Sequence, residues 1–126
     1  MLRGFGRVLL PFDGSPASTR AMTLAADIVS RWREEAEIRV LIVGGPERAA
    51  ECRELARDYL DPYGLTYGSV CEEGVAASVI PAFAQSWQAG LICMGAYGHT
   101  LLREVILGST TQAVARSWKR PLLLCP

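Results

Sequence analysis

The stretch that most constrains the fold is residues 91–111, LICMGAYGHTLLREVILGSTT. An apolar run ends at Met94, and Gly95 and Gly98 follow it. Nine residues separate Gly98 from Gly108 and Ser109, which precede a helix-like segment at 110–118. Glycine lets backbone amides approach a ligand, and a helix start presents N–H groups and the positive end of the helix dipole. The stretch therefore predicts a strand, a glycine turn and a helix start that suit an anion such as phosphate.

Short apolar runs alternate with amphipathic segments along the whole chain. The runs lie at residues 7–12, 37–43, 65–71, 91–94 and 122–125, and the helical segments follow residue 16 and span 47–60, 75–88 and 110–118. Continuous apolar runs are typical of strands buried on both faces, and strands that alternate with helices indicate a parallel sheet with right-handed crossovers. The sequence therefore predicts an α/β fold.

Single residues refine these segments. Residues 13–16 (DGSP) predict a turn and a helix start, with Ser15 as N-cap and Pro16 at the first helical position. Gly68 within the run 65–71 favours an edge strand, and Pro81 predicts a bend in the helix 75–88. In the helix 47–60, helical spacing predicts four inward-facing residues, namely Cys52, Leu55, Ala56 and Tyr59.

Composition excludes several classes of protein. With 126 residues, of which 50% are hydrophobic, the chain fits a single folded domain over residues 1–126. Thirteen basic residues balance thirteen acidic ones, so we expect neither nucleic acid nor a membrane as a partner. The four cysteines form no CxxC pair, and Cys93 and Cys125 lie in apolar runs. Because no signal peptide or membrane-length run is present, we expect a cytoplasmic protein with reduced thiols.

Motifs for common enzyme chemistry are missing. The sequence contains no GxxxxGK[ST], no GxGxxG after the first apolar run and no GxSxG. His99 is the only histidine, which excludes a multi-histidine metal site, and Ser109 has no neighbouring base. No pair of acidic residues accompanies the glycine stretch to hold magnesium or activate water. We therefore expect binding without catalysis, and weak ATP hydrolysis stays open.

The spacing Gly95-x2-Gly98-x9-Gly108-Ser109 closely resembles the nucleotide-binding signature of the universal stress protein family, in its ATP-binding branch. Residues 8–15 (VLLPFDGS) resemble the first strand and turn of that family, and residues 121–125 resemble its last strand. The resemblance covers nearly the whole chain. It implies a three-layer α/β/α, Rossmann-like fold of the adenine nucleotide alpha hydrolase type, with five parallel strands in the order 3-2-1-4-5. This order reverses direction between strands 1 and 4, where a crevice is expected beyond their carboxyl ends.

The resemblance also implies an adenine nucleotide ligand, ATP or else ADP or AMP, with Mg²⁺ held through the phosphates only. The residues that it implies as ligand contacts lie at strand ends and in the glycine stretch: Pro11, Phe12, Asp13, Val43, Met94, Gly95, Gly98, His99, Gly108, Ser109 and Thr110.

Within this set, the resemblance assigns Asp13 to the adenine edge and Val43 to a flank of the base. Pro11 and Phe12 would contact the base apolarly, and Met94 would lie in the core with its backbone near the ligand. The glycines would wrap the ribose and phosphates, Ser109 would donate its hydroxyl to a phosphate oxygen, and Thr110 could add a second hydroxyl or amide. For His99, a phosphate contact and plain exposure to solvent are equally open.

The last apolar strand, residues 122–125, raises the question of assembly. An edge strand with apolar side chains and unpaired amides is rarely left open, and pairing of two copies about a two-fold axis would cover it. The resemblance likewise implies a homodimer through Leu122–Cys125. It also implies a more open adenine side, because only residues 44–46 connect the second strand to its helix.

We therefore expect a nucleotide-responsive regulatory module that acts through an unknown protein partner. Two alternatives stay open from the sequence. The chain could act only as a dimerisation or interaction module that binds no nucleotide, or it could be a slow ATP hydrolase.

Overall fold

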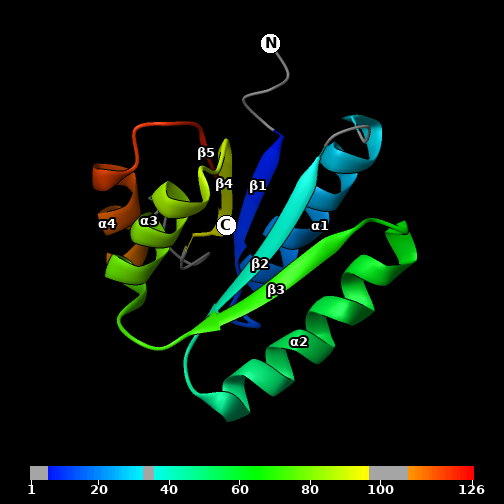
Figure 1. Ribbon diagram of the computed structural model, residues 1–126, viewed down its shortest axis with the longest axis horizontal. Helices are drawn as coiled ribbons and strands as arrows, with labels where there is room; N and C mark the ends of the chain where they lie inside the picture. Colours follow the sequence, from blue (N-terminus) through cyan, green and yellow to red (C-terminus); the bar gives the residue numbers. More distant parts are fainter. Residues whose placement is uncertain (1–5, 33–35, 97–107) are drawn as a thin grey trace.

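The computed structural model describes residues 6–32, 36–96 and 108–126 (Figure 1). Strands and helices alternate in the order β1 (Arg7–Pro11), α1 (Pro16–Trp32), β2 (Glu37–Val43), α2 (Pro46–Leu60), η2 (Asp61–Tyr63, a 3-10 turn), β3 (Tyr67–Glu72), α3 (Ala76–Trp87), β4 (Leu91–Gly95), α4 (Ser109–Ser117) and β5 (Leu122–Cys125). Each apolar run of the sequence has become a strand, so the predicted alternation is confirmed.

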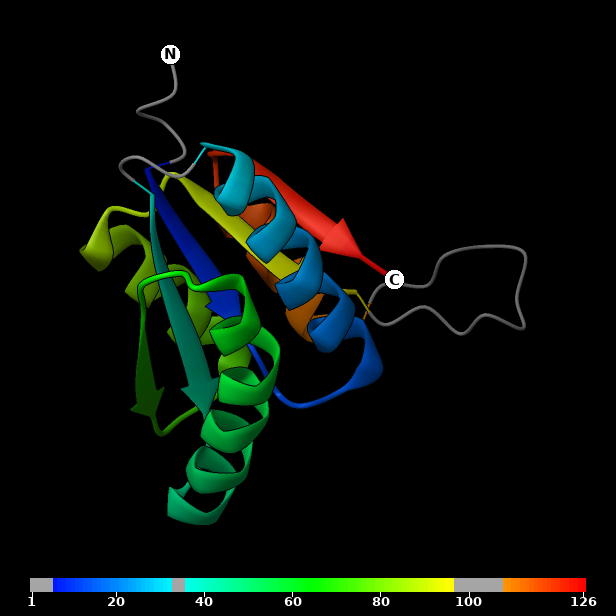
Figure 2. The same cartoon turned by 90° about the vertical axis from the view of Figure 1, so that its right-hand side faces the viewer.

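The five strands form one parallel sheet in the order β3-β2-β1-β4-β5. Helices α1 and α2 lie side by side over one face, and α3 and α4 cover the other (Figures 1 and 2). The three-layer fold and the expected strand order are confirmed, and β3 is an edge strand as Gly68 indicated. Because β1 and β4 are neighbours whose connections run in opposite directions, the crevice predicted beyond their carboxyl ends exists in the topology.

Two apolar cores explain why β1 is apolar without interruption. Val8 and Leu10 pack toward α1 and α2, and Leu9 packs toward Ile80 and Val114 of α3 and α4. These three side chains are at most 1% exposed. A strand with a helical layer on each face has no solvent side, so the period-two alternation of a half-exposed strand is absent.

Helix α2 faces the sheet differently from the prediction. Its buried residues are Ala49, Cys52, Ala56 and Leu60. Leu55 and Tyr59 are 39% and 42% exposed, so their predicted inward orientation is wrong. The helix packs over β2 and β3 at one edge of the sheet, where the inward stripe is narrow and small side chains allow close packing.

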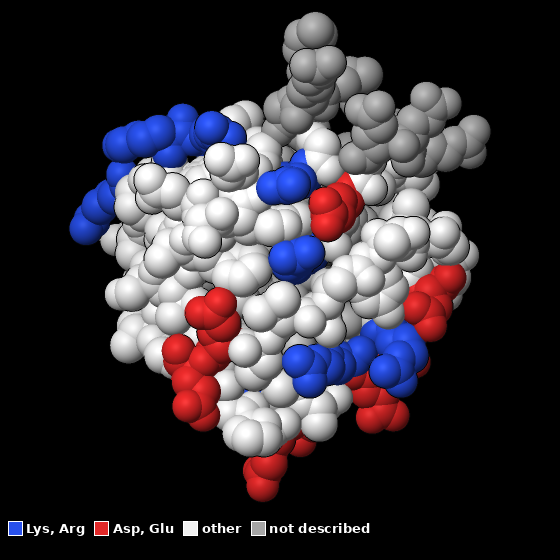
Figure 3. Space-filling view, in the orientation of Figure 1, with Lys and Arg blue, Asp and Glu red and all other residues white. Residues whose placement is uncertain are grey.

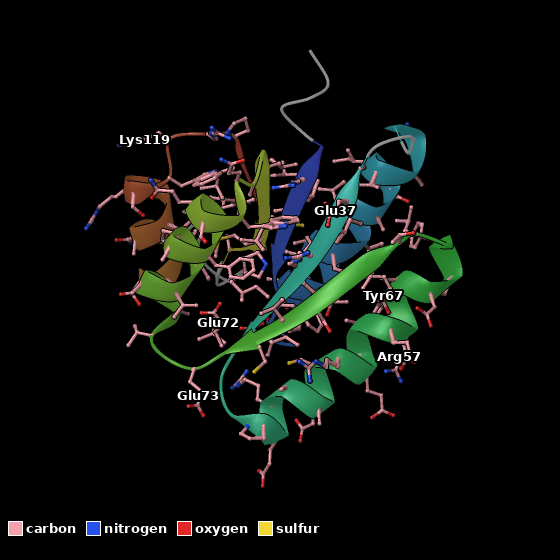
Figure 4. All side chains as sticks on the ribbon, in the orientation of Figure 1. Glu37, Arg57, Tyr67, Glu72, Glu73 and Lys119 are labelled. Atoms are coloured by element: carbon pink, nitrogen blue, oxygen red, sulfur yellow. The ribbon has the colours of Figure 1, made fainter. Side chains whose placement is uncertain are left out.

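Helix α3 continues through Pro81 as a single helix, although a proline inside a helix removes one backbone hydrogen bond. The helix ends at Trp87, whose ring forms cation–π contacts with two arginines. The Cζ atoms of Arg39 and Arg7 lie 4.8 and 5.7 Å from the ring centroid. Glu37, at the start of β2 (Figure 4), lies 3.7 Å from Arg7 and 3.4 Å from Arg39. These contacts are at the amino ends of the strands, away from the crevice.

Strand β4 and helix α1 approach each other closely at Gly95. A Cβ atom on Gly95 would lie 2.5 Å from the backbone nitrogen of Ser18 and 2.6 Å from the carbonyl carbon of Ala17. Those atoms belong to the first helical turn of α1 and cannot rotate away. Glycine is therefore required at this position for packing, whatever its part in ligand binding.

Cys93 is a fully buried thiol in the middle of β4. Its Sγ atom donates a hydrogen bond to the carbonyl oxygen of Ala21 at 3.3 Å. Burial, with a smaller contribution from the thiol of Cys125, raises the pKa of Cys93 from 9.0 to about 12. All four cysteines are free thiols, and no helix in the described part of the chain is long and apolar enough to cross a membrane.

Replacing Gly95 with alanine should lower the free energy of unfolding by about 1–3 kcal/mol, because the new methyl group must displace helix backbone. Gly68→Ala is the matched control, since its new Cβ would lie 3.8 Å from the nearest atom, Nε of Arg39, which is an ordinary contact. Urea unfolding followed by circular dichroism measures both variants. Equal stability of the two variants would contradict the close approach.

The buried thiol of Cys93 predicts a loss of stability at alkaline pH. Above pH 9 the thiol ionises in the unfolded chain but stays protonated in the folded one until about pH 12. In that window this one group should lower the free energy of unfolding by up to about 1.4 kcal/mol per pH unit. Unfolding curves of the wild type and Cys93→Ala across this range should therefore diverge in slope, and parallel pH profiles would refute the assignment.

Candidate functional site

A pocket of about 140 Å³ lies at the carboxyl ends of the central strands. It is bounded by β1, β2 and β4 and by the first turns of α1, α3 and α4, so elements from both helical layers meet there. Seven of the predicted site residues line it: Pro11, Phe12, Asp13, Val43, Met94, Gly95 and Thr110. Residues up to 99 positions apart in the sequence thus come together at the predicted crevice.

Strands β1, β2 and β4 supply the apolar wall of this pocket. Pro11, Phe12 and Met94 are buried at strand ends, and Val43 is half-buried at the end of β2. The backbone N–H of Phe12 donates to the carbonyl oxygen of Leu41 at 2.9 Å, which extends the β1–β2 pairing one residue past β1. Such a wall can contact a flat, apolar ring.

Asp13 begins the turn that connects β1 to α1. Its Oδ1 atom accepts a hydrogen bond from the backbone N–H of Ser15 at 2.9 Å. The Oγ atom of Ser15 in turn accepts the backbone N–H of Ser18 at 3.2 Å, so Ser15 is the N-cap and Pro16 the first residue of α1, as predicted. The turn therefore places a carboxylate at the pocket on a backbone held by its own hydrogen bonds.

The start of α4 forms the opposite side of the pocket. Gly108 is the N-cap residue, in an extended conformation with φ of −66° and ψ of 164°, and no side chain caps the helix. Thr110 and the buried Thr111 line the pocket, whereas Gly108 and the exposed Ser109 are not among its lining residues. The helix start thus borders the pocket, but the Ser109 side chain is not brought into it. Gly98 and His99 lie outside the described residues.

Sequence reasoning missed several residues of the pocket wall. They are Ser15, Ala17, Ser18, Leu41, Ala76, Ile80 and Thr111. The residues of α1 had a sufficient explanation as a helix start, and only their contact with Gly95 brings them to the pocket. Thr111 is polar and 1% exposed, and its position beside Thr110 was the one available signal.

The thiol near the pocket is not an activated nucleophile. Cys52 lies against Gly14, its Sγ 3.9 Å from the position of a Cβ there. Burial raises the pKa of Cys52 above 9.0, the positive charge of Arg48 opposes this, and Asp13 adds to it. The thiol is therefore protonated at neutral pH, and only a thiolate would be reactive.

The distribution of charged residues and the lack of grouped metal-ligating side chains in the described residues limit the kinds of ligand that this protein can bind. On the face in Figure 3, acidic and basic residues are scattered over a mostly uncharged surface, without a continuous basic stripe. Within residues 6–32, 36–96 and 108–126, no three side chains of His, Cys, Asp or Glu are grouped so that they could hold a metal ion. The pocket therefore offers a carboxylate, hydroxyls, a helix start and apolar walls, which suit a small molecule with a ring and an anionic group.

Comparison with known proteins agrees with the fold. Residues 42–126 match the universal stress protein family. The universal stress protein MJ0531 from Methanocaldococcus jannaschii is 26% identical over an alignment of 138 positions, which covers 95% of this chain and 81% of that protein.

Two solved structures have the same fold. One is a universal stress protein in complex with cAMP, with a TM-score of 0.78 and 23% identity over 95% of both chains. The other is a universal stress family protein from Arabidopsis thaliana with AMP bound, with a TM-score of 0.73 and 13% identity over 94% of this chain and 90% of that one. The matched segment contains β3, β4, β5 and the glycine stretch, and the strand order agrees with the family resemblance. The chain belongs to the universal stress protein family.

Proposed function

We propose that this protein binds an adenine nucleotide in the pocket at the ends of β1 and β4 and acts as a regulatory stress-response module with little or no turnover. The observation that carries the proposal is the convergence of Asp13, Val43, Gly95 and Thr110 on one pocket. These residues come from four separate segments, and the glycine spacing after β4 resembles the ATP-binding signature. The ligands of two proteins with this fold, cAMP and AMP, support an adenine nucleotide.

The chemistry of the pocket supports a division into two ends. The carboxylate of Asp13 can accept a hydrogen bond from the amino group of adenine, beside the apolar surfaces of Phe12 and Val43. The start of α4 and the hydroxyl of Thr110 can receive the anionic groups. In this proposal ATP, ADP or AMP would occupy the same place, and Mg²⁺ would be held through the phosphates alone.

Two features of the same arrangement support little or no turnover. Fast phosphoryl transfer requires a metal and a residue that positions water at the terminal phosphate. Asp13 is assigned here to the base end, and Cys52 is protonated at neutral pH. The output of the module would then be a nucleotide-dependent interaction with a regulatory protein partner.

The binding proposal is tested at Ala76, a half-buried residue that lines the pocket at the start of α3. Ala76→Phe should fill the pocket and weaken binding of ATP, ADP and AMP at least about tenfold, measured by isothermal titration calorimetry. The control is Val75→Phe, because Val75 is the preceding residue, is 68% exposed and is not in the pocket wall. This control should bind like the wild type. The proposal would be refuted by a wild type that binds no adenine nucleotide, or by equal nucleotide affinities of the two variants.

Small molecules released from protein purified without added ligand should include an adenine nucleotide by mass spectrometry. Incubation with ATP separates a binder from a slow hydrolase. ADP that accumulates over many turnovers, and that disappears in Ala76→Phe, would establish hydrolysis at this pocket instead.

We further propose that two copies pair through β5. This strand lies at the edge of the sheet, and all four of its residues are half-buried. Pairing of two such edges would satisfy the backbone groups that an edge leaves open. Sedimentation equilibrium should give twice the chain mass of 13.7 kDa at micromolar concentration. A species of single-chain mass under those conditions would exclude the dimer.

A further inference from the structure

One arginine joins the two loops at the base end of the pocket. Arg48 lies in the first turn of α2, and its Nη1 atom donates a hydrogen bond to the backbone carbonyl oxygen of Asp13 at 3.3 Å. Asp13 follows β1, and Arg48 belongs to the helix that follows β2. A single side chain therefore ties together the connections after two neighbouring strands, both of which end at the pocket.

The aliphatic part of Arg48 is held against Gly44. A Cβ atom on Gly44 would lie 2.6 Å from Cδ of Arg48 and 3.3 Å from its Cβ and Cγ, so position 44 must lack a side chain for the arginine to lie there. Gly44 itself is fixed by β3, because its N–H donates to the carbonyl oxygen of Glu72 at 2.9 Å and its own oxygen accepts from Sγ of Cys71 at 3.3 Å. The arginine side chain therefore packs against a backbone segment that is held by hydrogen bonds to β3.

Asp13 is consequently held from two directions. On one side its carboxylate accepts the N–H of Ser15, in the turn that leads to α1. On the other side its carbonyl accepts the guanidinium of Arg48, from α2. The charges of Arg48 and Asp13 both act on the thiol of Cys52, which places the three groups close together.

We propose that Arg48 is a positioning residue that gives the pocket its preference for adenine. This inference rests on the proposed function, in which the Asp13 carboxylate meets the base edge. Adenine presents an amino donor at position 6, where guanine presents a carbonyl acceptor. A carboxylate held opposite position 6 accepts a bond from the first and repels the second, whereas one that shifts toward the neighbouring N–H of guanine can accept a bond there, so the discrimination depends on how firmly Asp13 is placed.

The contact would contribute little as a surface interaction alone. Arg48 is exposed, and exposed charged contacts contribute little to stability because solvent screens them. Its value lies in geometry, because a carboxylate displaced beyond hydrogen-bonding distance from the base no longer distinguishes donor from acceptor. The connection between β2 and α2 is short, so Arg48 in the first turn of α2 lies within hydrogen-bonding distance of the Asp13 carbonyl.

The proposal is tested with Arg48→Met, which keeps an aliphatic chain against Gly44 and removes the donor. Binding constants for ADP, GDP, ATP and AMP are measured by calorimetry. We expect the affinity for ADP to fall about three- to tenfold with little change for GDP, so that the ADP-to-GDP ratio falls by the same factor. The ATP-to-AMP ratio should not change, because the phosphate end is formed by α4 on the opposite side of the pocket.

The matched control is Arg53→Met, which removes the same charge from an exposed position of the same helix. It should leave both ratios as in the wild type. Arg48→Lys keeps a donor and a stem and should restore part of the selectivity.

Two results would overturn this role for Arg48. One is a wild type that binds ADP while Arg48→Met retains full selectivity. The other is an equal loss of ADP and GDP affinity together with a lower melting temperature, which would make the arginine merely structural. A wild type that binds none of the four nucleotides would instead overturn the proposed function, and this inference with it.

Discussion

The contact between Gly95 and the first turn of α1 is the constraint on which the pocket depends. With no side chain at this position, the end of β4 lies against the backbone of Ala17 and Ser18. Any larger residue would collide with that backbone, so the close approach of β4 and α1, which both border the pocket, depends on this glycine. The glycine that begins the signature therefore has a packing role in addition to any role toward phosphate. Glycine satisfies both the packing requirement and the ligand requirement. Its position relative to the following helix is therefore informative about the site.

The fold was largely predictable because its strands are buried on both faces. Continuous apolar runs such as 7–12 and 91–94 have few other stable arrangements in a chain of this size. The turn at 13–16 contains a serine and a proline at the positions that N-caps and helix starts prefer, so the start of α1 could be predicted directly. The strand order itself came from the family resemblance, since alternation of strands and helices alone permits several orders.

What the sequence could not supply depends on how elements are rotated and how closely they approach. For α2, spacing identified an apolar stripe, but its centre is set by the helix's rotation over the sheet edge, so Leu55 and Tyr59 were misplaced while Leu60 was missed. The pocket residues of α1 were missed for a related reason. A helix start has a complete local explanation, and the contact of Ala17 and Ser18 with Gly95 of β4 arises only from tertiary packing.

The pocket lies between the two helical layers. Its wall includes Ser18 of α1, Ala76 of α3 and Thr110 of α4, so a bound ligand would contact both helical layers at once. A ligand that binds only the folded state stabilises all the elements it contacts, by an amount that grows with its concentration relative to its dissociation constant. Strand β4 also connects the pocket to β5, because Gly95 is paired with Cys125 and the N–H of Ala96 donates to the carbonyl oxygen of Cys125 at 2.7 Å. Thus the end of the pocket strand and the edge strand β5 share one hydrogen-bonded ladder, and whatever orders the first also restrains the surface on which a second copy would pair.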